Sequence, residues 1–599
     1  MELRQVRWAA LLVILAITGC VQTPGAYQRA GTPAMDTAPA REAPSSTESA
    51  RQRLGDMADP ARTDTALSWA SYYLVNDRAR EASEVLDLVR GGAQSMDQRF
   101  RWLQLSAQAL LGQHKPQQAL DLLNDYQGDI RSLPADQQAR LALLRADALA
   151  LNDNLMESLK ERVEIQPRLG RSDRAYNQEM TWQALLRVPR NQLQQEAEGA
   201  SGDLLGWLEL ADIYRDAQAG LDDQVARMND WQRRWPQHPA QAQLPETLNA
   251  MRRAAQERPA RVAVLLPESG PLSYAGNALH DGLMAGYYLA RDNGDYTPEL
   301  RFYDTADADA AQVYQQAVMD GAQFVIGPLA KDQVAAIDAL GTPPVPTLAL
   351  NYLDDGGNGL YQFGLAPEDE ARQVARDGYA AGAVRAGVLY PNSEWGYRVA
   401  EAFSNAWQSQ GGSIVVSRTY ADDDIGGSVK AFLDEARGNL GSSGGKEFRP
   451  RGPEDMAFVF LVANADQGRQ VKPALNYHYA RYLPVHSTSY IYGGVPDPRR
   501  DQDLDRVQFV DMPWVLTPDQ RLKDMATANW PDGHGRYTRL FAMGVDAFRL
   551  QARLPVLNNA PGSTLSGATG VLHLDGKRVV RELQWATFEG GLPSPLLTP

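Results

Sequence analysis

The sequence of 599 residues contains a single cysteine, Cys20, and only seven histidines. One thiol cannot form an intrachain disulfide, so the folded parts must be stabilised by packing alone, even in an oxidising compartment. No two histidines stand in an H-E-x-x-H pattern or in another recognised metal-binding spacing. No P-loop is present, and no G-x-G-x-x-G follows a predicted strand. We therefore expect no metal, no cofactor and no catalytic residues.

Positive charge is also scarce. Lysine and arginine number 59 against 74 aspartates and glutamates, which gives a formal net charge of -15. This balance argues against a nucleic-acid partner, because phosphate recognition needs a basic face. An acidic protein suits a protein partner that carries a basic patch. Simple solubility explains the charge equally well.

A long apolar run is missing as well. The apolar stretch before Cys20 has about ten residues, whereas a membrane-spanning helix needs ~20. Arg4 and Arg7 precede it, and Ile17-Thr18-Gly19-Cys20 ends it in the pattern that is cleaved and lipidated in bacterial lipoproteins. We expect a signal peptide over 1–19 and a lipid on Cys20. Val21 follows in place of the aspartate of inner-membrane retention, which predicts the periplasmic face of the outer membrane. The alternative is an ordinary signal peptide with an incidental cysteine.

Two regions precede the α/β part of the sequence. Proline, alanine, serine and threonine dominate residues 20–58, which predicts a disordered tether. Over 59–256 apolar residues recur at intervals of three and four, as on helices. Several helix pairs have tetratricopeptide-like spacing, although no clean repeat length emerges. We expect an all-α tetratricopeptide-like solenoid, with a plain helical bundle as the alternative. Either would offer a binding surface.

Residues 257–599 alternate strands and helices. Val262 to Leu266 is a continuous apolar strand, which is typical of a parallel sheet buried on both faces. The doubly wound pattern occurs twice and predicts two lobes around a cleft. The ranges expected are about 257–366 and 515–565 for lobe one, and about 367–514 and 566–599 for lobe two. The segments 570–576 and 583–588 are expected to form a hairpin.

Candidate ligand-binding residues are those expected at the carboxyl ends of the strands, where such folds bind ligands. They are Ser269, Ser273, Asn351, Tyr352, Glu394, Trp395 and Asn464. The turn from Pro267 to Ser273 leads into a helix and could present N–H groups to an anion. Gly276, Gly282 and Gly286 on that helix are equally consistent with tight packing of the helix on the sheet.

Five segments carry a resemblance to a known family. They are 324–329 (FVIGPL), 348–351 (LALN), 365–372 (LAPEDEAR), 398–403 (RVAEAF) and 544–548 (GVDAF). They resemble the type I periplasmic-binding-protein fold and, more closely, the LpoA family, whose members share the order of lipid signal, tether, tetratricopeptide-like helices and two-lobed domain. The similarity covers nearly all of the mature chain.

The resemblance implies a non-catalytic outer-membrane lipoprotein that binds and activates a bifunctional class A penicillin-binding protein and so promotes peptidoglycan synthesis. It does not place the contact residues. Amino-acid receptors of this fold hold the ligand carboxylate with hydroxyl side chains, but the turn 327–330 (GPLA) has none. Because an unpaired buried polar group costs ~1–3 kcal/mol, we expect that the cleft has lost amino-acid binding and takes no small-molecule ligand. The alternative function is a lipid-anchored periplasmic solute receptor of the type I class.

Overall fold

The computed structural model describes residues 43–93, 95–216, 219–354, 357–439, 456–531, 533–559 and 563–596. The expected signal peptide, Cys20 and the first half of the expected tether lie outside these residues. Contacts divide the chain into two compact units, Met1–Leu208 and Glu209–Pro599. No helix of the described part is long and apolar enough to cross a membrane.

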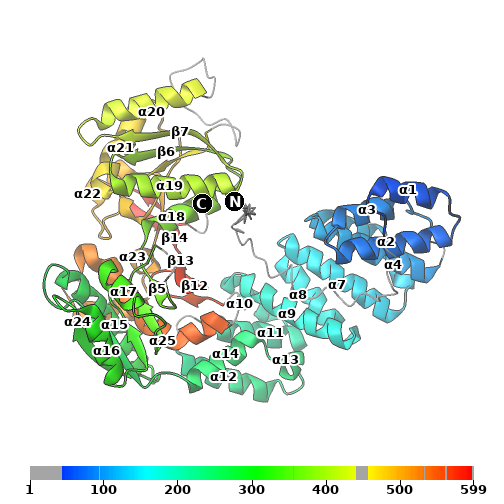
Figure 1. Cartoon of the computed structure of the whole chain (residues 1–599), viewed down its shortest axis with the longest axis horizontal. Helices are drawn as coiled ribbons and strands as arrows, with labels where there is room; N and C mark the ends of the chain where they lie inside the picture. Colours follow the sequence, from blue (N-terminus) through cyan, green and yellow to red (C-terminus); the bar gives the residue numbers. More distant parts are fainter. Residues whose placement is uncertain are drawn as a thin grey trace, which may run out of the picture. The chain divides into compact units, whose positions relative to one another are not determined.

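The first unit is a succession of helices in which sequence neighbours pack on one another (Figure 1). Its helices are α1 (Thr47–Gly55), α2 (Ala61–Val75), α3 (Ala79–Asp87), α4 (Met96–Gly112), α5 (Pro116–Asp125), α6 (Gln127–Ser132), α7 (Ala135–Leu151), α8 (Leu155–Ile165), the 3-10 turn η2 (Gln166–Arg168), α9 (Arg171–Arg187) and α10 (Arg190–Gly199). This confirms the predicted all-α region.

One turn recurs within three of these helix pairs. Asp77, His114 and Asp153 follow α2, α4 and α7, and each has a positive φ, between 56° and 61°. In each turn the next N–H donates to a carbonyl five residues back, as from Lys115 to Leu110 at 3.0 Å. This is the Schellman arrangement, in which glycine is usual at the left-handed position. Because aspartate and histidine stand there instead, the sequence conceals a repeat that the backbone shows.

The helical unit begins earlier than expected. Ser46 caps α1 by accepting from the Ser49 N–H at 3.3 Å, and Ala50 and Leu54 are buried in the core of the unit. The prediction that the tether extends to residue 58 is therefore wrong. The reason is that an apolar pair four residues apart is enough to bury one face of a short helix, while proline, serine and threonine dominate the composition around it.

The last helices of the predicted helical region belong to the second unit. They are α12 (Leu221–Arg234), α13 (Pro239–Ala242) and α14 (Glu246–Gln256), while α11 (Gly202–Arg215) crosses the boundary. Asp222 pairs with Arg258 at 2.5 Å and accepts from the Tyr296 N–H at 2.9 Å. Helix α14 packs on a long helix of the α/β part, α25 (Thr538–Asn559). The boundary expected at residue 256 therefore moves to Leu208, because these helices share packing with the sheets.

The first sheet has the order β11-β12-β13-β5-β4-β3-β1-β2. Its strands are β1 (Arg261–Leu266), β2 (Glu299–Asp304), β3 (Phe324–Ile326), β4 (Thr347–Ala349), β5 (Tyr361–Phe363), β11 (Leu565–Ser566), β12 (Val571–Asp575) and β13 (Arg578–Glu582). Strands β1 to β5 pair in parallel, and the helices of this lobe are α15 (Ser273–Asp292), α16 (Ala310–Met319), α17 (Lys331–Asp338), the 3-10 turn η5 (Gly535–Tyr537) and α25.

The second sheet has the order β15-β14-β10-β9-β8-β6-β7. Its strands are β6 (Arg385–Pro391), β7 (Ser413–Tyr420), β8 (Phe458–Leu461), β9 (Val485–Ser487), β10 (Val507–Asp511), β14 (Gln584–Glu589) and β15 (Leu592–Pro595). The helical segments with it are α18 (Pro367–Ala380), α19 (Glu394–Ser409), α20 (Ile425–Asn439), α21 (Ala465–Tyr477), η3 (Ser489–Ile491), α22 (Pro498–Asp501), η4 (Gln502–Leu504) and α23 (Pro513–Leu516). Helix α24 (Gln520–Asn529) packs on α15 of the first lobe. Two doubly wound lobes are thus confirmed (Figure 1).

The expected assignment of 566–599 to lobe two is wrong for its first half. Strand β12 turns back on β13 through Gly576, whose φ of 58° a glycine adopts without strain, and β13 pairs in parallel with β5 of the first sheet. Strand β14 pairs with β10 and β15 of the second sheet. The predicted hairpin of 570–576 with 583–588 is therefore replaced by two hairpins, with the crossing between lobes at Leu583.

Candidate functional site at the junction of the two lobes

The structure places every predicted cleft residue just beyond the carboxyl end of a strand. Ser269 and Ser273 follow β1, Asn351 and Tyr352 follow β4, Glu394 and Trp395 follow β6, and Asn464 follows β8. Their lining of a ligand site stays a prediction. The contacts that each makes describe how the protein itself uses these side chains.

In lobe one these polar atoms bond to the lobe itself. Ser269 donates its hydroxyl to Asp304 at 3.1 Å. Asn351 donates to the Leu329 carbonyl at 3.0 Å and accepts from the Tyr352 N–H at 2.9 Å. Ser273 is the first residue of α15, and its N–H donates to the Gly270 carbonyl.

Tyr352 connects separate strands of the first sheet. Its hydroxyl donates to the Val579 carbonyl at 2.8 Å and lies 3.2 Å from that of Gly364, while the Arg578 guanidinium lies 3.4 Å from the ring centroid. The ring is buried, and this burial raises the pKa of the hydroxyl. Tyr352 thus fixes β13 beside the segment that leaves lobe one.

In lobe two the predicted residues cap helices or pack. Asn464 forms a capping box with Gln467 at the start of α21. Glu394 is exposed on the first turn of α19 and pairs with Arg398 at 3.4 Å. Trp395 packs on Tyr490 with ring centroids 5.4 Å apart.

The sequence analysis did not identify the acidic first turn of α18 as a point of contact between the lobes. Glu368 pairs with Arg398 at 2.9 Å, within lobe two. Asp369 pairs with Arg578 at 2.7 Å, and Glu370 lies 3.6 Å from Arg581; both of these arginines are on β13 of the first sheet. The adjacent carboxylates of α18 are thus joined to both lobes.

Glu370 is the most buried of these acids. Its carboxylate accepts from the N–H and hydroxyl of Ser489 at 2.9 and 3.1 Å. Burial raises the pKa of Glu370, against the opposing effects of Arg581 and the Ser489 bonds. Donors from both lobes, Arg581 and Ser489, thus oppose the effect of burial on this carboxyl group.

A second ion pair crosses the junction from the start of α25 to the end of β10. Arg539 binds Asp511 through two nitrogens, at 2.9 and 2.5 Å, and also donates to the carbonyls of Ser489 and Tyr492 at 3.0 Å each. Burial opposes its charge, but Asp511 outweighs burial and the pKa of Arg539 lies above its usual value. This geometry is bidentate, and Nη2 has two further carbonyl acceptors.

Helix α18 also holds the strand that crosses between lobes. Gln373 donates to the Leu583 carbonyl at 2.9 Å and accepts from its N–H at 2.8 Å. Asp377 accepts from the Trp585 indole at 2.9 Å. One apolar cluster joins Val545 and Phe541 of α25 to the core of lobe two. The lobes are thus connected by a core as well as by ion pairs.

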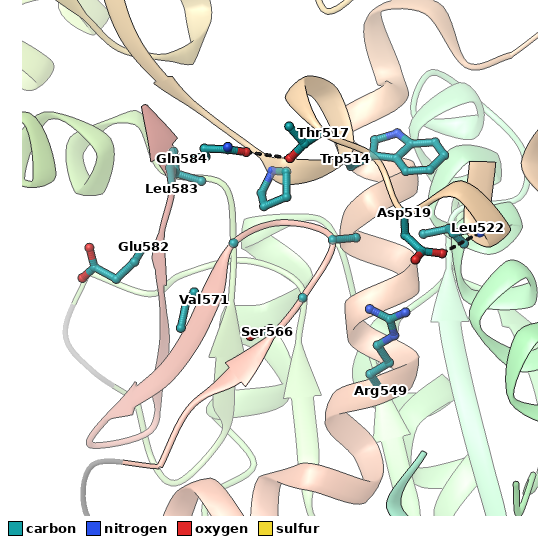
Figure 2. A pocket seen from close by; sticks show the side chains of 14 residues that line it. Trp514, Thr517, Asp519, Leu522, Arg549, Ser566, Val571, Glu582, Leu583 and Gln584 are labelled. Carbon is teal, nitrogen blue, oxygen red and sulfur yellow. Dashed lines mark hydrogen bonds between the residues drawn. The ribbon is translucent and has the colours of Figure 1, made fainter. Parts of the chain in front are cut away.

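A pocket of about 450 Å³ lies beside two of the crossing segments (Figure 2). Trp514, Thr517 and Leu522 come from the segment after β10, and Leu583 and Gln584 from the β13–β14 crossing. Thr517 donates to Gln584 at 2.8 Å across its edge. Because segments that enter and leave lobe two form its walls, a change in the angle between the lobes would change its volume.

Helix α25 contributes Arg549 to the remaining wall of this pocket. Figure 2 shows the Arg549 side chain extending from α25 toward Asp519, and its guanidinium lies 3.8 Å from Asp546. Asp546 already accepts from the N–H groups of Ala568 and Thr569 and from the Thr569 hydroxyl, at 2.6–2.8 Å. Burial raises the pKa of Asp546. In the described residues no group of three or more histidine, cysteine or acidic side chains could hold a metal ion.

The turn and glycines after β1 are explained by packing. A Cβ on Gly276 would lie 2.0 Å from the Pro267 carbonyl oxygen, and one on Gly282 would lie 1.9 Å from that of Phe541. From the opposite helix, a Cβ on Gly544 would lie 2.2 Å from the Leu279 carbonyl oxygen. These glycines let α15 approach its strand and α25 closely.

The fold and the junction define a class of protein. It has a helical-repeat unit followed by a two-lobed domain of the periplasmic-binding-protein type, and ion pairs, hydrogen bonds and an apolar cluster connect the two lobes. A family model described as LppC putative lipoprotein matches residues 52–591. The chain therefore belongs to the LppC family.

Relatives named penicillin-binding protein activator LpoA match most of the chain. The one from Photobacterium profundum is 29% identical over 482 residues, 76% of each chain. The one from Vibrio cholerae serotype O1 is 28% identical over 509 residues, 82% of this chain and 83% of that protein. The crystal structure of Haemophilus influenzae LpoA matches with a TM-score of 0.61 at 22% identity, covering 93% of this chain and 99% of that one, a likeness of fold.

Proposed function

We propose that the protein is a non-catalytic activator of a bifunctional class A penicillin-binding protein, which it binds from the periplasmic face of the outer membrane. The observation that carries this proposal is the similarity, along three quarters or more of both chains, to proteins named penicillin-binding protein activators. A match of that extent includes both the helical unit and the two-lobed domain.

The junction supports a protein partner over a small solute. A solute receptor of this fold needs polar groups that await a ligand and lobes free to close. Among the predicted cleft residues, the buried Trp395 indole N–H has no hydrogen-bond partner in the described chain. Here Arg539 is bound by Asp511 and two carbonyls, Glu370 is held by Arg581 and Ser489, and the lobes share an apolar cluster. A ligand would have to replace these bonds, at ~1–3 kcal/mol for each group left unpaired.

Activation without chemistry requires differential binding. If the protein binds the active conformation of the synthase more tightly than the inactive one, binding shifts the population toward the active state. A lipid on Cys20 would keep the protein close to the membrane and raise its local concentration near the wall. The reach of the segment before α1 would then limit where activation occurs.

The test uses the mature chain without its lipid, beginning at residue 21. Added to a purified class A synthase with lipid II, it should increase the rate of glycan polymerisation or of peptide crosslinking, and it should bind the synthase in a surface-plasmon-resonance assay. Added to a monofunctional transpeptidase, it should do neither. Product formed by the chain alone, or no affinity for any class A synthase, would contradict the proposal.

A solute-receptor function is tested by calorimetry of the same chain with amino acids, sugars and muropeptides. A micromolar ligand that leaves synthase binding unchanged would favour the receptor.

A further inference from the structure

A groove of about 750 Å³ lies on the helical unit, between α3, α4 and α5. Its volume falls within the range of ligand-binding clefts. Helix α4 forms the floor, and α3 and α5 form the walls. Nothing described at the junction of the lobes involves this surface.

The floor is apolar and aromatic. Trp102 is buried and donates its indole N–H to the Leu86 carbonyl at 3.1 Å, and its ring lies 5.4 Å from that of Tyr126. Leu110 and Leu122 are only partly buried and line the same surface. An apolar side chain seated here would cover these exposed parts.

One polar atom on the floor lacks a partner. The Ser106 hydroxyl is buried and makes no hydrogen bond, although Ser106 lines the groove. Other helical hydroxyls in this chain bond to the carbonyl four residues back, as Thr181 and Ser404 do at 2.7 Å. Because a buried hydroxyl without a partner is unfavourable, Ser106 indicates a hydrogen-bonding group that reaches the floor from outside.

The unbalanced charge on the walls is negative. On α3, Arg80 pairs with Glu84, and Arg90, just after α3, pairs with Asp87 at its end. On α5, Asp125 has no ion pair or side-chain hydrogen bond within the described chain, and Asp121 accepts only from the uncharged Gln117 amide at 2.9 Å. At one end of the groove, Lys115 donates to Gln113.

We propose that this groove binds a polypeptide segment that combines an apolar side chain with lysine or arginine. The apolar side chain would pack on Trp102 and Tyr126, a backbone group would bond to Ser106, and the cation would face Asp121 and Asp125. The walls favour a cation because two lining carboxylates, Asp121 and Asp125, have no ion pair within the described chain, against one such lining cation, Lys115. A segment fits better than a compact ligand, since its backbone supplies donors and acceptors between the side chains.

The probe is a fluorescein-labelled 12-residue peptide of leucine and lysine, with a leucine–glutamate peptide of equal length as its counterpart. Fluorescence anisotropy with the delipidated mature chain should show binding of the lysine peptide, and binding that weakens as salt is added. The double variant Asp121→Asn/Asp125→Asn should weaken it at least tenfold. Ser106→Ala should weaken it severalfold without lowering the melting temperature.

The matched control is Glu157→Gln/Glu164→Gln, which removes the same charge from exposed positions of α8 outside the groove. This control should change the affinity less than twofold. Equal losses in both double variants would reduce the binding to net charge and overturn the proposal. Equal binding of the glutamate peptide, or displacement of the lysine peptide by a disaccharide–tetrapeptide fragment of peptidoglycan, would also overturn it. These results are independent of synthase activation.

Discussion

Arg539 and Asp511 form a bidentate ion pair at the junction, in which Asp511 is fully buried and the Arg539 side chain is 18% exposed. Taking two charges out of water costs energy that only good geometry restores. Removing one partner therefore lowers the free energy of unfolding more than replacing both by apolar residues would, because the other charge stays buried without a partner. This asymmetry makes Arg539 a sensitive probe of the contact between lobes.

We expect Arg539→Leu to lower the free energy of unfolding by about 3–5 kcal/mol, because Asp511 is fully buried and loses its cation. Urea denaturation followed by tryptophan fluorescence measures this. The control is Lys430→Met, which breaks an exposed pair with Asp434 and should cost about 1 kcal/mol or less. Equal effects of the two variants would show that the pair between lobes is not buried in solution.

His486 makes lobe two sensitive to acid. Its ring is buried, stacks on Phe458 at 4.2 Å and contacts Trp585 at 5.3 Å, and burial lowers its pKa to about 4. In the unfolded chain His486 has the ordinary pKa of about 6.5. Between that value and about pH 4 the unfolded chain is therefore protonated at His486, whereas the folded chain is not. The stability that His486 contributes is complete above that value and is lost as pH falls toward 4.

Between pH 7 and pH 5 the wild-type chain should therefore lose about 2 kcal/mol more unfolding free energy than His486→Phe, at about 1.4 kcal/mol for each unit below the unfolded pKa. Denaturation curves at both pH values measure the difference. His478→Gln, at a half-buried position at the end of α21, should retain the acid sensitivity. An unchanged pH dependence in His486→Phe would assign the effect to other groups.

At the scale of elements, α1 decides where the folded unit begins. Leu54 is 1% exposed and sits in the core with Ala50. Leu54→Ala should destabilise the helical unit by about 2–4 kcal/mol, whereas the same change at the partly exposed Leu151 should cost about 1 kcal/mol or less. Differential scanning calorimetry separates these outcomes. An unaltered unfolding transition in Leu54→Ala would show that α1 is not part of the folded unit and would support a tether that extends to residue 58.

Helices α15 and α25 meet through glycine. Gly544→Ala should destabilise the α/β unit by about 3 kcal/mol or more, because its Cβ would overlap the Leu279 carbonyl oxygen and two helices would have to separate. Gly426→Ala on α20 meets open space and should stabilise by up to about 1 kcal/mol. If both variants shift the melting temperature in the same direction, helices α15 and α25 do not approach as closely at Gly544 as the structure shows.

The elements that the sequence predicted well are those with a strong local pattern. The apolar strand β1, expected over Val262 to Leu266, could be read directly. The three-residue strands β5 (YQF) and β9 (VHS) could not, because each contains a polar residue and is too short to show a period. The predicted hairpin joined 570–576 with 583–588, which are β12 and β14, and left out the strand β13 between them. It was misassigned because β13 and β14 belong to different sheets, and their partners β5 and β10 lie far away in sequence.

The contacts of the candidate site could not be predicted from the sequence, and the role of the predicted residues in a ligand site stays a prediction. Strand order put the predicted residues at the carboxyl ends of the strands, as the topology requires. The pairing of Glu370 with Arg581 joins residues two hundred positions apart, which a single sequence cannot reveal. A detectable signal did exist: arginines and a glutamate in the five-residue strand β13 have to find partners if the strand is buried.

For the whole molecule, activation in the cell should depend on reach. If a lipid on Cys20 holds the protein at the outer membrane, the segment between residue 21 and α1 sets how far the folded units extend toward the synthase. Deleting half of residues 21–46 should weaken activation in cells, since the shorter segment brings fewer synthases within range. It should leave activation in solution unchanged, because no contact with the synthase is removed.

The matched control replaces the deleted residues with a glycine–serine stretch of equal length, which should restore activity in cells because length alone is required. Growth of a strain that depends on this activator, and synthase rates with the purified chains, are the two readouts. Equal loss in cells and in solution would mean that the segment itself touches the synthase. Loss in cells that the glycine–serine stretch fails to restore would make its sequence, and not its length, the determining property.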